Sequence, residues 1–284
     1  MKGLSFAATI FFCLIILDTF IWGQIFFAGP AKNAEIYGLD VGQGDSELVV
    51  LPGNVKILID GGPDNSILGN LSSVFGSADR YIDLVVMSHP QMDHFMGLID
   101  VLKRYRIGAF IYNGQTGVAP SFKDLANAIQ ENKIPAVAVR EGDKIISGEN
   151  RLDILSPSLA DLKNKDVNLG ALVLELFSAG KKALFTADID SGIEKKLVQK
   201  YDLDVDVLKV GHHGSKFSSS NEFLKAATPI ISFIEVGAKN TYGHPTAEAL
   251  KRITDAGSQI FRTDKNGLIK IDLTSAEIKV WDER

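Results

Sequence analysis

The chain has 284 residues, of which 45% are apolar, and a formal net charge of −5; this is enough for one large domain or two small ones with a buried core, which argues against disorder. Lysines are intermixed with aspartates and glutamates without a broad basic stripe, so a nucleic-acid substrate would have to be held locally, by a metal or a few cations. Cys13 is the one cysteine, which excludes a disulfide framework and a cysteine-rich zinc site.

The N-terminal segment differs in composition from everything after it. Residues 6–27 are apolar apart from interruptions such as Asp18 and Gln24, and this is close to the ~20 residues that cross a bilayer as a helix. Lys2 precedes the segment and favours export of the residues on its C-terminal side. We therefore predict a membrane anchor and linker over residues 1–33, with the rest of the chain outside the cytoplasmic membrane.

Two alternatives for this segment stay open. One is a signal peptide that is cleaved after export, which would release the remainder as a secreted protein. The other is a buried core helix, which Asp18 favours because a carboxylate in the middle of a membrane costs several kcal/mol.

From residue 34 onward, short apolar runs that end at Gly, Asp or His alternate with segments of helical spacing. We predict strands at 34–42, 46–53, 55–62, 83–89, 108–114, a hairpin at 171–188, and strands at 205–215, 230–237, 259–264 and 268–274. We predict helices at 95–105, 121–134, 191–201, 219–227 and 246–257. Ser121 is the expected cap of the second helix, and Ser219 with Glu222 forms a capping box on the fourth. Residues 34–284 are therefore expected to form one α/β domain with two sheets faced by helices.

All the histidines of the chain lie in three short segments at predicted strand ends, beside Gly, Pro or Asp. They are His89, His94, His212, His213 and His244. A single histidine is more often structural than functional, but five at such turns favour a functional site.

The segment "SHPQMDH", residues 88–94, carries nitrogen and oxygen donors suited to a divalent cation: His89, Asp93 and His94. Since Asp93 and His94 are adjacent and expected in a loop, they cannot easily serve one ion. A pair of ions a few ångströms apart is the natural use of such a group.

A second donor set is expected from two later strand ends. Asp188 follows the apolar run "KALF" and would serve as a bridging ligand, and His212 and His213 follow "VDVLKV". Gly211 and Gly214 allow the backbone to turn tightly around the two histidines.

Six segments together carry a resemblance to a known family: "DVGQGDSELVV", "LIDGG", "SHPQMDHFMGL", "LFTADID", "VLKVGHHGSKFSSS" and "NTYGHP", in this order across nearly all of residues 36–270. The chain resembles the metallo-β-lactamase-fold hydrolases, and within them the extracellular hydrolase domain of ComEC-type competence proteins and their stand-alone relatives. The resemblance implies an αββα sandwich with metal ligands on loops along one edge.

The family pattern HxHxDH, or HxDxDH in the competence group, implies that His89, Asp93 and His94 belong to the metal cluster and that Gln91 stands at a further ligand position. The bridging aspartate of the family falls on Asp188. The ligand of "GHHGS" falls on His213 or His212, and we slightly favour His213.

The resemblance also implies roles around the metal. Asp60 matches an aspartate that orients the ligand loop by hydrogen bonding. The loop bordering the metals contributes Asp40, Gln43 and Asp45, and a substrate-side loop contributes Asn240, Tyr242 and His244. His244 could meet a phosphate oxygen or protonate a leaving group. Ser215 and the adjoining "KFSSS" could hold a phosphate, or could form a plain capping loop.

Three positions depart from the family pattern. Ala187 and Met96 replace glycines, which we interpret as steric adjustments. Gln91 replaces a histidine or aspartate, and its amide oxygen is a neutral, weaker ligand. One ion should therefore be bound less tightly, be a harder ion such as manganese or magnesium, or be missing; we expect one or two ions per chain, zinc or manganese.

These observations predict a metal-dependent hydrolase that acts on a phosphoester, with the backbone of single- or double-stranded DNA as the favoured substrate. Asp93 and His244 are the expected catalytic groups for proton transfer. One alternative is a small phosphate ester as substrate of the same fold. The other is a non-catalytic extracellular binding module, for which Gln91 is the reason.

Overall fold

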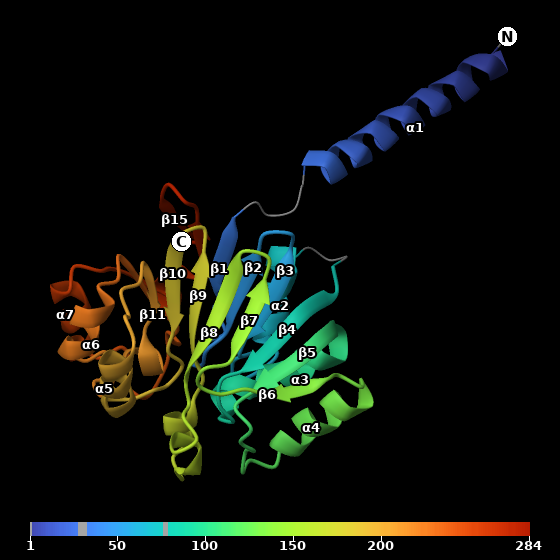
Figure 1. The fold of residues 1–284 in the computed structure, drawn as a ribbon. Coiled ribbons are helices and arrows are strands. Elements are labelled where there is room, and N and C mark those ends of the chain that lie inside the picture. Colours follow the sequence, from blue (N-terminus) through green and yellow to red (C-terminus); the bar gives the residue numbers. More distant parts are fainter. Residues whose placement is uncertain (1, 28–32, 76–78) are drawn as a thin grey trace.

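The computed structural model describes residues 2–27, 33–75 and 79–284, with only the backbone described for residues 2–5 and 23–27. Most of the predicted linker, residues 28–32, lies outside the described residues. Two β-sheets lie face to face, and helices cover the outer face of each (Figure 1). This is the αββα sandwich that the sequence predicts.

One sheet has eight strands in the order β15-β14-β1-β2-β3-β4-β5-β6 and the other has seven in the order β13-β12-β11-β10-β9-β8-β7. The strands are β1 (Ala34–Gly38), β2 (Glu47–Leu51), β3 (Val55–Ile59), β4 (Tyr81–Met87), β5 (Arg106–Tyr112), β6 (Ala136–Ala138), β7 (Lys144–Ser147), β8 (Asn150–Ser156), β9 (Val173–Ser178), β10 (Lys181–Phe185), β11 (Val207–Lys209), β12 (Ile231–Ile234), β13 (Gln259–Arg262), β14 (Ile269–Leu273) and β15 (Ile278–Asp282).

The helices are α1 (Lys2–Phe27), α2 (Ser66–Phe75), α3 (Met92–Arg104), α4 (Phe122–Glu131), α5 (Ser191–Lys200), α6 (Asn221–Ala227), α7 (Ala247–Asp255) and α8 (Thr263–Asn266). Three short 3-10 turns accompany them: η1 (Asp161–Lys163), η2 (Val167–Gly170) and η3 (Gly211–Gly214).

Period-two alternation along the strands builds the layers. In β4, Val85 packs toward α2, α3 and α4, and Val86 packs between the sheets. In β11, Val207 packs between the sheets and Leu208 packs toward α5, α6 and α7. Because these strands are buried on both faces, their sequences are continuous apolar runs. Such runs in the sequence therefore indicate the central strands of each sheet.

The N-terminal segment forms a helix, α1, whose described side chains, residues 6–22, are all exposed. Across the described residues, no helix combines the length and the apolar character needed to cross a bilayer. The prediction of a transmembrane helix over residues 6–27 is therefore not supported.

Two of the predicted helix caps differ in the structure. Ser121 lies in the cap position of α4 but makes no side-chain cap hydrogen bond. The cap of α6 is Ser220, whose hydroxyl accepts from the amide of Phe223, and Ser219 instead donates its amide to the carboxylate of Glu194. A buried carboxylate holds Ser219 and so leaves the cap to its neighbour.

Candidate metal centre

The predicted ligands follow parallel strands, and this brings them to one edge of the sandwich. Strands β3 and β4 are parallel neighbours, as are β10, β11 and β12. Because parallel strands end at the same edge of a sheet, the loops that follow them meet there. These loops carry Asp60, His89, Asp188, His213 and His244.

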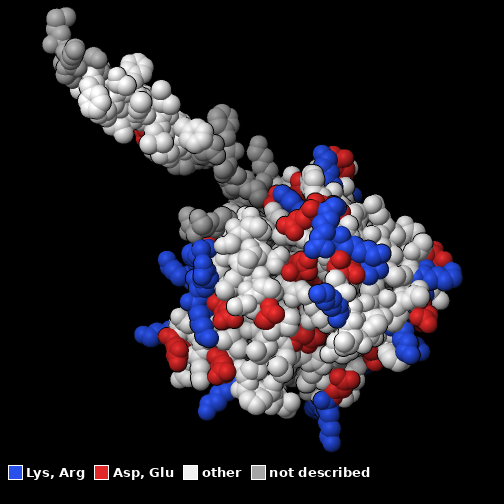
Figure 2. Space-filling model, turned by 180° about the vertical axis from the view of Figure 1, so that it is seen from behind, with Lys and Arg blue, Asp and Glu red and all other residues white. Residues whose placement is uncertain are grey.

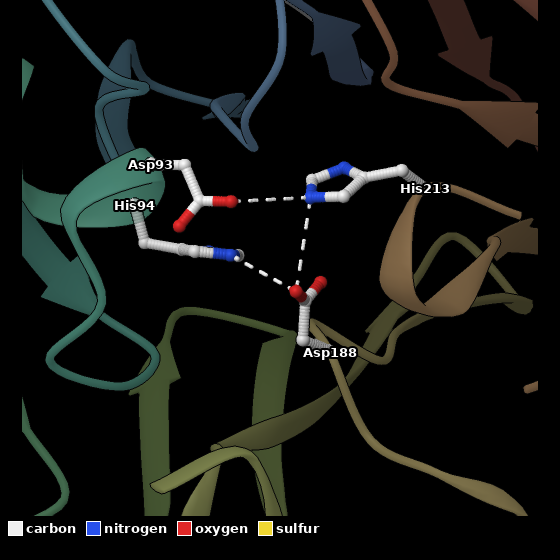
Figure 3. A group of neighbouring side chains, drawn as sticks. All are labelled: Asp93, His94, Asp188 and His213. Carbon is white, nitrogen blue, oxygen red and sulfur yellow. Dashed lines mark ion pairs between the residues drawn. The ribbon is translucent and has the colours of Figure 1, made fainter. Parts of the chain in front are cut away.

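Four side chains converge at this edge: Asp93, His94, Asp188 and His213, which we call the metal cluster (Figure 3). One ligand atom of each lies within 4.8 Å of the others. Asp188 Oδ2 lies 3.4 Å from His94 Nε2 and 3.7 Å from His213 Nε2, and Asp93 Oδ2 lies 3.5 Å from His213 Nε2. Two carboxylates and two imidazoles are a donor set suited to zinc or manganese.

The outer nitrogens of the imidazoles are held by fixed partners. His94 Nδ1 lies 2.8 Å from Asp60 Oδ2, and His213 Nδ1 lies 2.9 Å from the backbone oxygen of Glu235. Each contact places the proton on Nδ1 and leaves the Nε2 lone pair facing the cluster. Asp60 thus lies where the sequence predicts an orienting aspartate, with φ 55° and two further hydrogen bonds from Ser88.

Several buried polar atoms of the cluster have no hydrogen-bond partner. They are His94 Nε2, His213 Nε2 and both carboxylate oxygens of Asp188. Burying such atoms without a partner is costly. A divalent cation at their common point would satisfy all of them, so the residues present fit a metal ion.

The charges of the cluster depend on one another. Burial alone would raise the pKa of Asp188, but the neighbouring imidazoles of His213 and His94 hold it well below its usual range. Burial would lower the pKa of His213, but Asp188 and Asp45 outweigh this and raise it to about 10. The carboxylates therefore attract positive charge to this point, either as protons on the imidazoles or as a metal ion.

Helix α3 begins at Met92, so Asp93 and His94 lie in its first turn and not in a loop. Both side chains reach the same group of donors. The prediction that these adjacent residues cannot easily serve one ion is therefore wrong. Helix geometry, which gives successive side chains different directions, here lets Asp93 approach His213 while His94 approaches Asp188.

His89 and Gln91 lie beside the metal cluster without joining it. Among the described residues, His89 belongs to no group of three or more converging His, Asp or Glu donors, and Gln91 lines the cavity. His89 packs against His94 with ring centroids 4.1 Å apart, and its Nδ1 lies 2.9 Å from the Ser88 hydroxyl. The side-chain amide of Gln91 donates to Asn168 Oδ1.

The two histidines of "GHHGS" are placed differently. His213 is buried and contributes Nε2 to the metal cluster, whereas His212 is one third exposed, with Nε2 3.7 Å from Asp188 Oδ2. Both have positive φ, 51° and 53°, which turns the chain sharply between Gly211 and Gly214. The geometry favours His213 as the ligand and places His212 toward the outside.

A cavity of about 390 Å³ opens above the metal cluster. Its lining includes Gln43, Met92, Tyr242 and His244 together with the cluster residues Asp93, Asp188 and His213. Tyr242 is 71% exposed, and its ring stacks nearly parallel to that of His244, with 9° between the planes. Asn240 holds this loop by donating to the backbone oxygens of residues 237 and 244.

Two predicted site residues lie away from the cavity. Asp40 is 3.3 Å from a guanidinium nitrogen of Arg284 and is absent from the cavity lining. Ser215 is buried, and its hydroxyl accepts from the amide of Phe217, which matches the plain capping loop that the sequence left open.

Beneath the metal cluster lies a second group of buried charged residues, which we call the lysine cluster: Asp45, Glu47, Lys209 and Glu235. Lys209 and Asp45 form an ion pair, and Asp45, Glu47 and Glu235 each bring a carboxylate oxygen within 4.8 Å of one another. Asp45 Oδ1 also lies 3.1 Å from His213 Nδ1, so the two clusters touch. Of these four, the sequence singled out only Asp45.

Comparison with known proteins agrees with this fold. Residues 39–234 match the model of the metallo-beta-lactamase superfamily, and the chain belongs to that superfamily.

Among curated proteins, the chain is similar to competence protein ComA of Neisseria gonorrhoeae, with 32% identity over 91% of this chain and 36% of the relative. It is also similar to ComE operon protein 3 of Bacillus subtilis (strain 168), with 26% identity over 91% of this chain and 35% of the relative. The chain thus spans about a third of the length of these relatives.

Among solved structures, the metallo-beta-lactamase fold protein YhfI from Bacillus subtilis superposes with a TM-score of 0.56 and 10% identity, covering 84% of this chain and all of YhfI. At that identity the likeness shows the fold alone.

Proposed function

We propose that this chain is a metal-dependent phosphodiesterase whose substrate is the DNA backbone. The observation that carries the proposal is the metal cluster, with its unpartnered donor atoms, at the floor of an open cavity of about 390 Å³. The resemblance to competence-type proteins supports the choice of DNA.

Asp93, His94, Asp188 and His213 would hold the ion. A divalent ion supplies Lewis-acid charge, which stabilises anionic oxygen and lets water lose a proton near neutral pH. The surrounding residues fix the donors: Asp60 and the backbone of Glu235 orient the two imidazoles before substrate arrives.

His244, which lines the cavity, would accept a proton in this reaction. Its Nδ1 is buried and has no hydrogen-bond partner, and its backbone amide is fixed by Asn240. Burial, followed by the nearby His212, lowers the pKa of His244. A neutral imidazole beside the metal cluster can act as a general base, and it can return the proton to a leaving oxygen.

The walls of the cavity suit a nucleotide. Tyr242 offers an exposed ring beside the metal cluster, on which a base next to the scissile phosphate can stack. Charged side chains of both signs are interspersed on the face of the molecule in Figure 2, and the net charge is −5. A short single-stranded segment held by stacking fits these features better than a long duplex held by electrostatics.

The direct test is hydrolysis by the full chain loaded with manganese or zinc. We expect cleavage of bis-nitrophenyl phosphate and of single-stranded DNA, and loss of both activities on chelation. A complete lack of phosphodiester hydrolysis in the metal-loaded chain would refute the proposal. Activity on small esters but not on DNA, insensitive to salt, would instead favour the small-ester alternative.

The stacking role of Tyr242 has a matched control. Phe217 is also an exposed aromatic residue, 64% exposed, but it is not among the residues lining the cavity. Tyr242→Ala should raise KM for a dinucleotide about 10-fold, in line with about 1–3 kcal/mol per stacked base, and Phe217→Ala should leave it unchanged. Equal KM values for the two variants would refute a role of Tyr242 in substrate binding.

The location of the enzyme stays a prediction. The apolar N-terminal segment before the domain supports delivery across the cytoplasmic membrane, where extracellular DNA would be available. Fusion of a reporter that is active only outside the cytoplasm to the C-terminus tests this, and an inactive reporter would refute it.

A further inference from the structure

We propose that this chain holds one divalent ion tightly, in the metal cluster, and that Gln91 keeps the neighbouring position beside His89 from retaining a second. The inference rests on the metal centre of the proposed function and adds the number of ions and the residue that sets it. It concerns side chains that lie within one loop and helix start, residues 88–94.

The first step is where the charged donors lie. Asp93, His94, Asp188 and His213 each bring a ligand atom to the same point. Asp93 could have served a separate ion, but its carboxylate faces His213, at 3.5 Å from Nε2. The donors that remain for the neighbouring position are His89, Gln91 and any oxygen of Asp188 that does not bind the first ion.

The second step is charge. Asp93 and Asp188 together neutralise one divalent cation, and the imidazoles of the cluster are neutral when they act as ligands. A second cation would bring two further charges into a buried place where both added donors, His89 and Gln91, are neutral. The nearby buried carboxylates are already engaged, since Asp45 pairs with Lys209 and Asp60 faces the far side of His94. An uncompensated buried charge is strongly unfavourable.

The third step is the orientation of Gln91. Its amide nitrogen donates to Asn168 Oδ1, across 77 positions of sequence. Asn168 is itself fixed in the turn η2, because its amide donates to Asp166 and its carbonyl accepts from Ala171. The Gln91 side chain is thereby held as a link between two loops. Its amide oxygen takes no part in that bond, but as a neutral donor it adds no charge that could compensate a second ion.

His89 alone does not change the conclusion. Its Nε2 is buried without a hydrogen-bond partner and is free to interact, but one neutral nitrogen gives little affinity for a divalent ion. His89 therefore belongs to a position that an ion can enter at high concentration and leaves easily.

The test is the metal content of the full chain, measured by native mass spectrometry after loading with excess manganese and dialysis. Wild type should retain one ion. Gln91→Asp adds the missing carboxylate and should retain two, with the second dissociation constant lowered by roughly 100-fold. Gln91→Met, of similar length without a donor, should retain one, and Gln91→His provides a second gain variant should the aspartate fail to fold.

The electron paramagnetic resonance spectrum of bound manganese gives a readout that does not depend on activity. Wild type should show isolated ions, and Gln91→Asp should show spin-coupled pairs. Two tightly held ions in wild type, or one ion in Gln91→Asp and Gln91→His alike, would overturn the inference. Wild type without any retained ion would overturn it together with the proposed function, whereas one retained ion without hydrolysis would count against the function alone.

Discussion

Two groups of buried charged side chains lie next to each other in this molecule, and they differ in the origin of their positive charge. The metal cluster has two carboxylates and two imidazoles whose protons are held on the outer nitrogens. The lysine cluster has three carboxyl groups around the ammonium of Lys209. Both bring at least three potential metal donors together, but only the second contains a permanent cation.

This difference separates a metal site from a self-neutralised group. Lys209 is fully buried, and although burial alone would lower its pKa, Asp45, Glu47 and Glu235 raise it, so its charge is permanent. In the metal cluster positive charge comes only from protons that a metal ion can replace. We infer that a group of buried acids marks a metal site when the chain itself supplies no lysine or arginine to it.

The largest expected effect comes from removing the carboxylate charge of Asp188 from the metal cluster. Asp188→Asn keeps the shape of the side chain and should lower phosphodiester hydrolysis by at least about 10³-fold, because several kcal/mol of charge stabilisation disappear. Asp190→Asn is the matched control, since Asp190 caps helix α5 and asparagine caps equally well. The rate of phosphodiester hydrolysis should be measured for both variants after the same metal loading. Similar losses of activity in the two variants would contradict a specific role of Asp188 in the metal cluster.

The next effect tests the lysine cluster. Lys209→Met removes the cation from three buried acids and should lower the free energy of unfolding by about 3–5 kcal/mol. Adding Asp45→Asn to this variant should restore part of the loss. Lys251→Met, at an exposed ion pair in helix α7, should change stability by less than about 1 kcal/mol. Denaturant unfolding measures all of these, and a Lys209→Met protein as stable as wild type would contradict the account.

Metal ions should stabilise the protein through one cluster only. At a free concentration 100 times the dissociation constant, binding adds about 2.7 kcal/mol to the free energy of unfolding. Wild type and Glu235→Gln should both show this gain with manganese over a chelator, and Asp188→Asn should not. If Glu235→Gln loses the gain while Asp188→Asn keeps it, the two clusters have been assigned the wrong way round.

The smallest effect is a pH dependence from Glu47. Burial, only partly offset by Lys209, raises the pKa of Glu47 to about 8, so the folded protein binds more protons than the unfolded chain between the ordinary value of 4.5 and about 8. The free energy of unfolding should therefore fall as the pH rises through this window. Glu47→Gln should flatten that slope, whereas the exposed Glu248→Gln should not. Unfolding titrations at both ends of the window check this, and equal slopes in the two variants would speak against a protonated Glu47.

Much of the sandwich could be predicted because its central strands are buried on both faces. Strands such as β4 and β11 are continuous apolar runs, and each ends in the residues of the site. The strands β6, β7, β8 and β15 were missed. Three of them, β6, β7 and β15, are short and largely exposed at the sheet edges, whereas β8 alternates buried apolar with charged residues along part of its length. Helix α2 was missed because Gly69 and several serines are poor helix formers, and its stability comes from Ile67 and Leu71 packing into the core.

The residue types of the site could be predicted from the sequence, but several contacts between those residues could not. The residue types at strand ends pointed to metal donors, and the structure brings Asp93, His94, Asp188 and His213 together. The hydrogen-bonded residues Gln91 and Asn168 are 77 positions apart in the sequence, and the ion-paired Lys209 and Asp45 are 164 apart. No local sequence pattern predicts contacts over such separations. Such contacts depend on how the loops of two sheets meet, which only the folded chain defines.

The central claim is that an ion belongs to the metal cluster and not to the lysine cluster. Anomalous X-ray diffraction from crystals of the zinc-loaded protein tests it most directly, because the signal locates zinc independently of any assay. We predict a strong peak between Asp93, His94, Asp188 and His213, with none between Asp45, Glu47 and Glu235. A peak in the lysine cluster, or no peak at the metal cluster, would contradict the account.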